Sequence, residues 1–375
     1  MTARRINGRW LAGVLGLLVF GTGPEGQAQV PAGIDGIDGA DAPPPPEPPP
    51  TWRFKLAARP VKVVVLAGSI GAWPKQPYAE RIAKLCKHVE VKNISKVGFG
   101  AFALRQRFKQ QVLERLPQLK QAGNEYWLVF QGGLNSVGTP ERTNHDIREV
   151  FMLAHSRGFK VVGLSLTPWG DETDKRWAGV AGLKYLRATT RVVDFVAGTL
   201  TPAEALGEFA GRRAAGANAA WQPEEQADVA VDLYRSSLRA ADAPLRDTEA
   251  LTRRLEKDRG WQAAHVSLDA DARATLARTE AAAAAEIPRW FLREELRSFD
   301  HIHPNAEGHR LIAEAACPRL PASWGCECPT SPAAAVATPG TPPVAGRPDP
   351  PNLLLLLYPP WLRVLLGWPG RSPIR

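Results

Sequence analysis

The chain has 375 residues, of which 44% are hydrophobic and 23% are charged, and its formal net charge at pH 7 is +9. This length supports one large hydrophobic core with room for an added subdomain. The positive charge favours anionic envelope polymers as partners. No basic stripe interleaved with aromatic residues stands out, which argues against nucleic-acid binding.

The first 28 residues have the features of a Sec-type signal peptide. Arg4, Arg5 and Arg9 form a basic head, residues 10–20 form a short apolar core, and Gly26-Gln27-Ala28 offers a cleavage site. The apolar run is too short for a comfortable transmembrane helix. We therefore expect a secreted or periplasmic protein, in which the proline-rich residues 29–52 form a solvated linker.

The folded domain is expected over residues 53–329. Mostly apolar runs predict buried strands at Val61–Ala67, Val89–Ile94, Glu125–Gln131, Phe159–Leu166 and Gln226–Leu233. Helices are predicted at about residues 77–87, 103–119, 146–157, 176–196, 246–257, 270–297 and 306–316. This alternation indicates a three-layer α/β/α fold, flavodoxin-like, with a five-stranded parallel sheet. The long helical insertion before residue 300 would form either a lid over a site or a thickening of the domain.

Ser69 lies where the first strand should end, next to Gly68 and Gly71, which let the chain turn sharply. Parallel sheets place their ligands at this end of their strands. Taken alone, such a serine is more often a helix cap. The far end of the chain favours a nucleophile instead, because Asp300 and His303 have the spacing that brings a carboxylate and an imidazole together. A structural histidine, or a metal ligand beside His301, is the alternative for His303, although no second cluster has metal-ligand spacing.

Four blocks in this sequence resemble those of the SGNH hydrolase superfamily, also called GDSL-like esterases and lipases. In chain order the blocks are Ala67-Gly68-Ser69-Ile70, Asn93-Ile94-Ser95-Lys96-Val97-Gly98, Gly132-Gly133-Leu134-Asn135 and Asp300-His301-Ile302-His303-Pro304. The first block has Ala-Gly-Ser where the family usually has Gly-Asp-Ser, and Ser136 stands where an aspartate usually follows the asparagine. The last block matches the family pattern Asp-x-x-His-Pro without departure.

The resemblance implies a serine hydrolase that cleaves carboxylic esters, either carbohydrate O-acyl groups or short-chain esters, without a metal or an organic cofactor. It makes Ser69 the nucleophile, His303 the base and Asp300 the residue that orients the base. The oxyanion hole would consist of the backbone N–H groups of Ser69 and Gly98 and the side-chain amide of Asn135.

We further expect Trp169 and Gly100 to contact a small-molecule or polysaccharide ester in a monomeric protein. An O-acyltransferase acting on an envelope glycan remains an alternative. The two missing aspartates also leave open a non-catalytic binding module of the same fold.

The four cysteines, Cys86, Cys317, Cys326 and Cys328, predict disulfides in an exported chain. A bridge from Cys86 to one of the other three would tie the end of the domain back to its core. A direct Cys326–Cys328 pair would be strained, and a zinc site is a weaker alternative. Residues 330–375 predict a disordered Pro/Ala-rich tail whose apolar end could touch a membrane peripherally.

Overall fold

The structure of the chain is a computed structural model, which describes residues 52–170, 180–210, 220–240, 246–285 and 291–329. The predicted signal peptide, the predicted linker up to residue 51 and the predicted tail over 330–375 lie outside these residues. So does the beginning of the helix predicted from residue 176. Within the described residues, no helix has the length and apolar character needed to span a membrane.

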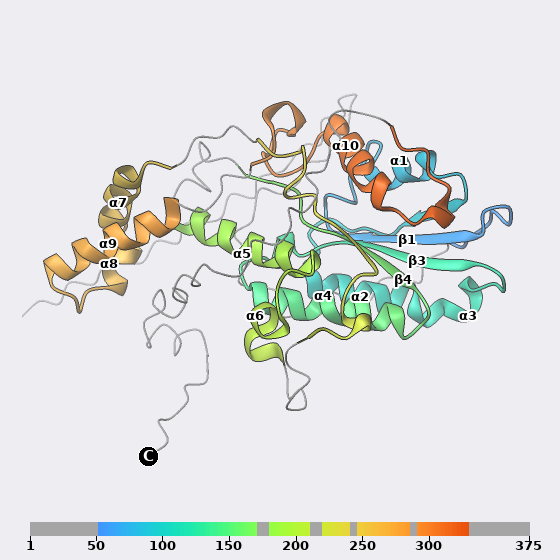
Figure 1. Ribbon diagram of the computed structural model, residues 1–375, viewed down its shortest axis with the longest axis horizontal. Coiled ribbons are helices and arrows are strands. Elements are labelled where there is room, and N and C mark those ends of the chain that lie inside the picture. The colour runs from blue at the N-terminus through green and yellow to red at the C-terminus, as the bar shows by residue number, and fades with distance from the viewer. Residues whose placement is uncertain (1–51, 171–179, 211–219, 241–245, 286–290, 330–375) are drawn as a thin grey trace, which may run out of the picture. The chain divides into compact units, whose positions relative to one another are not determined.

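One sheet of five parallel strands forms the centre of the fold, in the spatial order β2-β1-β3-β4-β5 (Figure 1). The strands are β1 (Val61–Ala67), β2 (Val89–Asn93), β3 (Glu125–Gln131), β4 (Lys160–Leu164) and β5 (Val229–Val231). Every residue of β1 is buried, as its uninterrupted apolar sequence predicts for a strand covered on both faces. From β1 the chain first adds β2 on one side and then β3, β4 and β5 on the other side. Sheets of this kind bind their ligands at such a switch point, here between β1 and β3. The predicted flavodoxin-like fold is confirmed.

Helices cover both faces of the sheet (Figure 1). On one face, α1 (Tyr78–Leu85) and α10 (Ala306–Ala316) pack against the strands through an apolar core that includes Val65, Ile82 and Ile312. On the other face, α2 (Ala101–Gln111) and α4 (Pro140–His155) lie next to each other. Phe130 of β3 meets Phe151 of α4 edge to face, with ring centroids 5.7 Å apart. The helix α5 (Val180–Val196) packs against α4.

Several helix boundaries differ from those predicted. The single helix predicted over residues 103–119 is two helices in the structure. The first, α2, ends at Gln111, and the second, α3 (Leu116–Leu119), begins after a 3-10 turn. Pro117 explains this break, because proline lacks an N–H donor and is tolerated only in the first turn of a helix. The helix predicted over residues 270–297 is shorter in the structure, where α9 spans Ala270–Ala285 and Glu294–Leu296 form a separate 3-10 turn. The short α6 (Pro202–Leu206), which was not predicted, starts at a capping box between Thr201 and Glu204.

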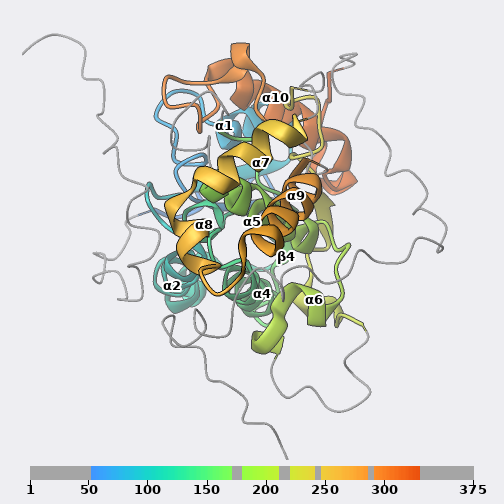
Figure 2. The ribbon, with the colours of Figure 1, turned by 90° about the vertical axis from the view of Figure 1, so that its left-hand side faces the viewer.

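Three helices of the insertion form a small cluster of their own. In Figure 2, α7 (Thr248–Lys257), α8 (Arg259–Ala264) and α9 lie together, and they bury a shared apolar core that includes Leu251, Trp261 and Ala281. The chain leaves the main core for this cluster and re-enters it at one antiparallel pair, where Ala240 N–H donates to Phe291 O at 2.7 Å and Arg293 N–H donates to Leu238 O at 3.0 Å. The three helices therefore belong to one insertion in the main domain, and the role of this insertion as a lid stays a prediction.

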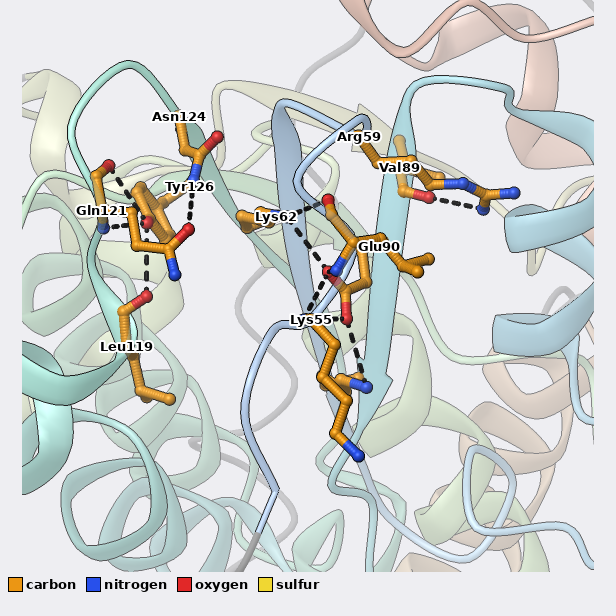
Figure 3. A network of polar contacts seen from close by, with 11 residues as sticks. Lys55, Arg59, Lys62, Val89, Glu90, Leu119, Gln121, Asn124 and Tyr126 are labelled. Atoms are coloured by element: carbon orange, nitrogen blue, oxygen red, sulfur yellow. Dashed lines mark hydrogen bonds and ion pairs between the residues drawn. The ribbon is translucent and has the colours of Figure 1, made fainter.

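A buried ion pair fastens β1 to β2 near the amino ends of these strands (Figure 3). Lys62 is 1% exposed and Glu90 is 4% exposed, and Lys62 Nζ lies 3.0 Å from Glu90 Oε2. The same carboxylate accepts hydrogen bonds from the backbone N–H groups of Lys55 and Leu56. Burial works to raise the pKa of Glu90, but these N–H donors, together with Lys62 and Lys92, outweigh it and lower that pKa.

Two disulfides close the carboxyl end of the domain, Cys86–Cys326 and Cys317–Cys328. The first joins residues 240 positions apart and ties this end back to the end of α1, as expected for a bridge from Cys86. All four cysteines are used, which removes the alternative of a cysteine zinc site. Crosslinks over such long stretches of chain stabilise a fold chiefly by restricting the unfolded chain.

Candidate active site

Ser69 lies two residues beyond the carboxyl end of β1, as the sequence predicts. The turn that carries it is closed by a hydrogen bond from Gly68 N–H to Gln131 O at 3.3 Å and by one from Ala72 N–H to Gly68 O at 3.1 Å. A Cβ atom at Gly71 would come within 2.4 Å of Ala67 Cβ and 2.6 Å of Ser95 Oγ. Only glycine lets the chain turn back so closely at this point.

The structure brings His303 to Ser69 from 234 residues away. The Nε2 atom of His303 lies 2.7 Å from Ser69 Oγ, within ordinary hydrogen-bonding distance. Its Nδ1 atom contacts Asp300 Oδ2. An ionised carboxylate can only accept, so Nδ1 carries the proton and Nε2 is left to accept the hydrogen of Ser69. The three side chains therefore form a continuous chain of polar contacts from Ser69 through His303 to Asp300.

Asp300 is held by its own loop. Its Oδ1 atom accepts hydrogen bonds from Ser298 Oγ at 2.7 Å and from the N–H groups of Ile302 and His303, each at 3.0 Å. Burial works to raise the pKa of Asp300, but the hydrogen bonds from His303 and Ile302 outweigh it, so the pKa lies well below its usual range. The carboxylate is therefore ionised at neutral pH.

The turn between Asp300 and His303 is fixed at both ends. Ser298 N–H donates to His303 O at 2.8 Å, and Gly170 N–H, from the loop after β4, donates to His301 O at 2.9 Å. His301 has a φ of +63°, a left-handed conformation that is uncommon outside glycine. Backbone strain of this kind costs on the order of 1–3 kcal/mol and persists where the surrounding structure enforces it.

Asn135 lies in the 3-10 turn Leu134–Ser136, just past the end of β3. Its Nδ2 atom donates to Phe99 O at 3.3 Å. Ser69 and Asn135 line a small hollow that is partly open to solvent. The full lining is Gly68, Ser69, Ile70, Phe99, Gln131, Gly132, Gly133, Leu134, Asn135 and Leu166.

Three predicted site residues lie outside this lining: Gly98, Gly100 and Trp169. Gly98 has a φ of +79° and immediately precedes Phe99, which does line the hollow. Gly100 is the N-cap of α2. Trp169 is buried and donates from Nε1 to Thr189 Oγ1 at 3.1 Å.

Ser136, which stands in place of the usual aspartate, has a structural contact of its own. Its Oγ atom accepts a hydrogen bond from Ala101 N–H at 3.1 Å, at the first residue of α2. A Cβ atom at Gly100 would lie only 3.0 Å from Ser136 Cβ. The small hydroxyl side chain thus joins the loops that follow β2 and β3, both of which border the hollow.

An aromatic stack that was not predicted leads from His303 into the core. The ring of Trp73 stacks on His303 with centroids 5.8 Å apart, and it meets His309 at 5.7 Å. His309 in turn stacks on Tyr78 at 6.1 Å. The only sequence signal for Trp73 was its position four residues after Ser69.

His309 lies within this stack as a fully buried imidazole of α10. Neither of its ring nitrogens has a hydrogen-bond partner among the described residues. Burial, with smaller contributions from the charges of Arg81 and His303, lowers its pKa to about 3. His309 is therefore neutral in the folded protein at pH 7.

This burial predicts a pH-dependent contribution to stability. Between pH 6.5 and about 3, the unfolded chain protonates His309 and the folded protein does not. The free energy of unfolding should therefore fall with decreasing pH, by up to about 1.4 kcal/mol per unit from this group. Urea unfolding of His309→Phe, which keeps an aromatic ring in the stack, should show a shallower pH dependence over this window than the wild type. Parallel curves would contradict the assignment.

Among the described residues, no group of three His, Cys, Asp or Glu side chains could hold a metal ion. The side chains of Ser69, His303 and Asp300 instead form a hydrogen-bonded relay beside the small hollow.

The comparisons with known proteins give structural matches only: no protein-family model and no curated protein matches the chain. It is similar to the structure of a GDSL-like lipase from Bacteroides thetaiotaomicron, with 13% identity over 69% of this chain and 86% of that one, at a TM-score of 0.37. It is also similar to a member of the lipolytic protein G-D-S-L family from Veillonella parvula, with 11% identity over 68% of this chain and 96% of that one, at a TM-score of 0.35.

A further match is a catalytic mutant of an acetylxylan esterase from Geobacillus stearothermophilus, with 12% identity over 71% of this chain and 96% of that one, at a TM-score of 0.35. At such identities and TM-scores, what the protein does has to be inferred from its own site.

Proposed function

We propose that this protein is a serine hydrolase of the SGNH type that cleaves carboxylic esters. The observation that carries the proposal is the relay in which His303 Nε2 lies 2.7 Å from Ser69 Oγ while His303 Nδ1 contacts Asp300. A serine hydroxyl at neutral pH needs such a base, and the base needs an orienting carboxylate. The relay opens on a hollow at the carboxyl ends of parallel strands, where this class of sheet binds ligands.

In the proposed reaction, His303 takes the proton of Ser69 as Oγ attacks the ester carbonyl. The ionised Asp300 keeps the imidazole in the correct tautomer and stabilises its cation. His303 then gives the proton to the leaving alcohol, and an acyl group remains on Ser69. Water, deprotonated by the same imidazole, releases the acid and restores the serine.

The negative charge that develops on the carbonyl oxygen needs hydrogen-bond donors fixed in advance. We assign this role to the backbone N–H groups of Ser69 and Gly98 and to the Nδ2 atom of Asn135. Asn135 and Ser69 both line the hollow, which supports their part in the assignment. One such donor is worth about 3 kcal/mol of transition-state stabilisation.

The small size of the hollow favours a small acyl group over a long fatty-acid chain. We therefore propose small-molecule esters or acylated polysaccharides as substrates. We also propose that the protein is exported. Its two disulfides support this, because such crosslinks persist in oxidising compartments.

Labelling with a fluorophosphonate probe tests the proposal before any substrate is known. We expect the wild-type chain to be labelled at Ser69, and we expect neither Ser69→Ala nor His303→Ala to be labelled, because the probe reacts with serines activated by a base. Peptide mass spectrometry would locate the label, and circular dichroism would check that the variants fold. Equal labelling of Ser69→Ala, or no labelling of a well-folded wild type, would refute the assignment.

A further inference from the structure

Gln131 is a polar residue at the end of an otherwise buried strand. It closes β3 and is only 2% exposed. Neither its Nε2 atom nor its Oε1 atom has a hydrogen-bond partner among the described residues. Buried side-chain amides almost always have partners, because an unmade hydrogen bond is costly in a low-dielectric interior. An amide with both ends unpaired therefore calls for a functional explanation.

The position of Gln131 supplies one. It pairs with Ala67 of β1 in the parallel register, and it is one of the residues that line the same hollow as Ser69 and Asn135. Residues of β3 at alternate positions before it, Val129 and Trp127, belong to the core under α1 and α10. By this alternation the side chain of Gln131 belongs to the face that α10 covers, and His303 lies in the turn just before Asn305, the N-cap of that helix.

A primary amide offers one donor group and one acceptor group side by side. The groups that satisfy both at once are those that also donate and accept, and a hydroxyl is the simplest of them. A purely aliphatic ester has no hydrogen-bond donor, so it would leave the Oε1 atom of Gln131 unpaired when it fills the hollow and excludes water. Sites built to hydrogen-bond a hydroxyl discriminate strongly against analogues that lack it.

We propose that Gln131 is a specificity-determining residue that hydrogen-bonds a hydroxyl group of the substrate, so that the enzyme prefers hydroxylated esters to aliphatic ones. This inference rests on the proposed ester hydrolysis. The hydroxyl can belong to the alcohol, as in an acetylated sugar, or to the acyl group, as in a 2-hydroxy acid. In either case the amide accepts from the hydroxyl at Oε1 and donates to it from Nε2.

Three esters of similar size separate these sources: cyclohexyl acetate, a mono-O-acetylated methyl xylopyranoside and cyclohexyl glycolate. The full-length wild type should prefer one of the two hydroxylated esters to cyclohexyl acetate. The preferred ester shows whether the recognised hydroxyl belongs to the alcohol or to the acyl group. Gln131→Met keeps the length of the side chain and removes the amide. We expect it to lower kcat/KM for the preferred ester by about 10- to 100-fold. The value for cyclohexyl acetate should stay within about threefold.

Two controls keep a structural role apart from a specificity role. Gln118→Met changes an exposed glutamine in α3, which leads into the opposite end of β3, and it should leave all three rates unchanged. Thermal unfolding of Gln131→Met should not occur at a lower temperature than that of the wild type, because a buried amide without partners does not stabilise the fold. Equal losses on all three esters, or a lowered Tm together with those losses, would overturn the inference.

Failure of the inference differs from failure of the proposed function. An active wild type that does not discriminate among the three esters overturns the role of Gln131 and leaves ester hydrolysis standing. A wild type that cleaves none of them refutes the function. In that case the inference is tested separately, by calorimetric binding of the acetylated xyloside and of cyclohexyl glycolate to Ser69→Ala and to the double variant that also carries Gln131→Met. If the double variant binds either ligand about 10-fold more weakly, the inference is supported. If the two variants bind each ligand with equal affinity, the inference is overturned.

Discussion

Replacing Ser69 by alanine is expected to lower kcat/KM for ester hydrolysis by about 10⁴- to 10⁶-fold. The Oγ atom lies 2.7 Å from His303 Nε2, and without it neither the attack on the carbonyl nor the covalent intermediate can occur. Losses of this size are typical when the nucleophile of a Ser-His-Asp triad is removed, and the residual rate comes from oxyanion stabilisation and binding. Initial rates with p-nitrophenyl acetate, measured over a wide range of enzyme concentration, would give the value.

The fold should survive this substitution, because Ser69 contributes one hydroxyl group at the edge of a hollow. Ser156→Ala is a matched control: it also removes a serine hydroxyl, in that case at the exposed end of α4, where Oγ donates to Leu153 O. We expect this variant to keep the wild-type rate. If Ser69→Ala retained more than about a tenth of the wild-type rate, Ser69 would not be the nucleophile.

The second large effect concerns stability. Glu90→Leu should lower the free energy of unfolding by about 3–5 kcal/mol, because it leaves Lys62 buried without its anion. Lys62 would keep its hydrogen bond to Leu56 O, at 2.7 Å, but a carbonyl oxygen does not balance its charge. The backbone N–H groups of Lys55 and Leu56 would also lose their acceptor. Urea unfolding monitored by fluorescence, with an unchanged m-value, would measure the change.

A double variant separates the buried charge from the other losses. Lys62→Met combined with Glu90→Leu should recover about half of the lost stability, because paired apolar replacements remove the uncompensated charge. The exposed pair Arg253–Glu249 on α7 provides the contrast, since Glu249→Leu should cost less than about 1 kcal/mol. Strictly additive effects of the Lys62 and Glu90 substitutions would show that the two charges are not coupled.

Local patterns in the sequence were sufficient for most of the fold. The bounds predicted for β1 and β3 are those of the structure, as are those of α10. Continuous apolar runs identify strands that are buried on both faces, and the proline at 304 followed by Asn305 marks the start of a helix. The predictions were wrong about where α3, α4 and α6 begin. These starts are set by Pro117, Pro140 and the capping box at Thr201, where one residue outweighs the average helix propensity of its neighbours.

The sequence alone determined which residues to consider at the site: Ser69, Asp300, His303 and Asn135 occur in recognisable blocks next to predicted strands and helices. Tertiary structure decided their partners. Contact between Ser69 and His303 depends on α10 packing beside α1, and the stack of Trp73 on His303 follows from the same packing.

The pairing of Cys86 with Cys326 likewise depends on which segments meet across the sheet, and so does the lack of a partner for the Gln131 amide among the described residues. The periodicity of a chain reports which face of an element is buried. Which atoms meet there is set by the packing of segments far apart in sequence, and no local pattern encodes it.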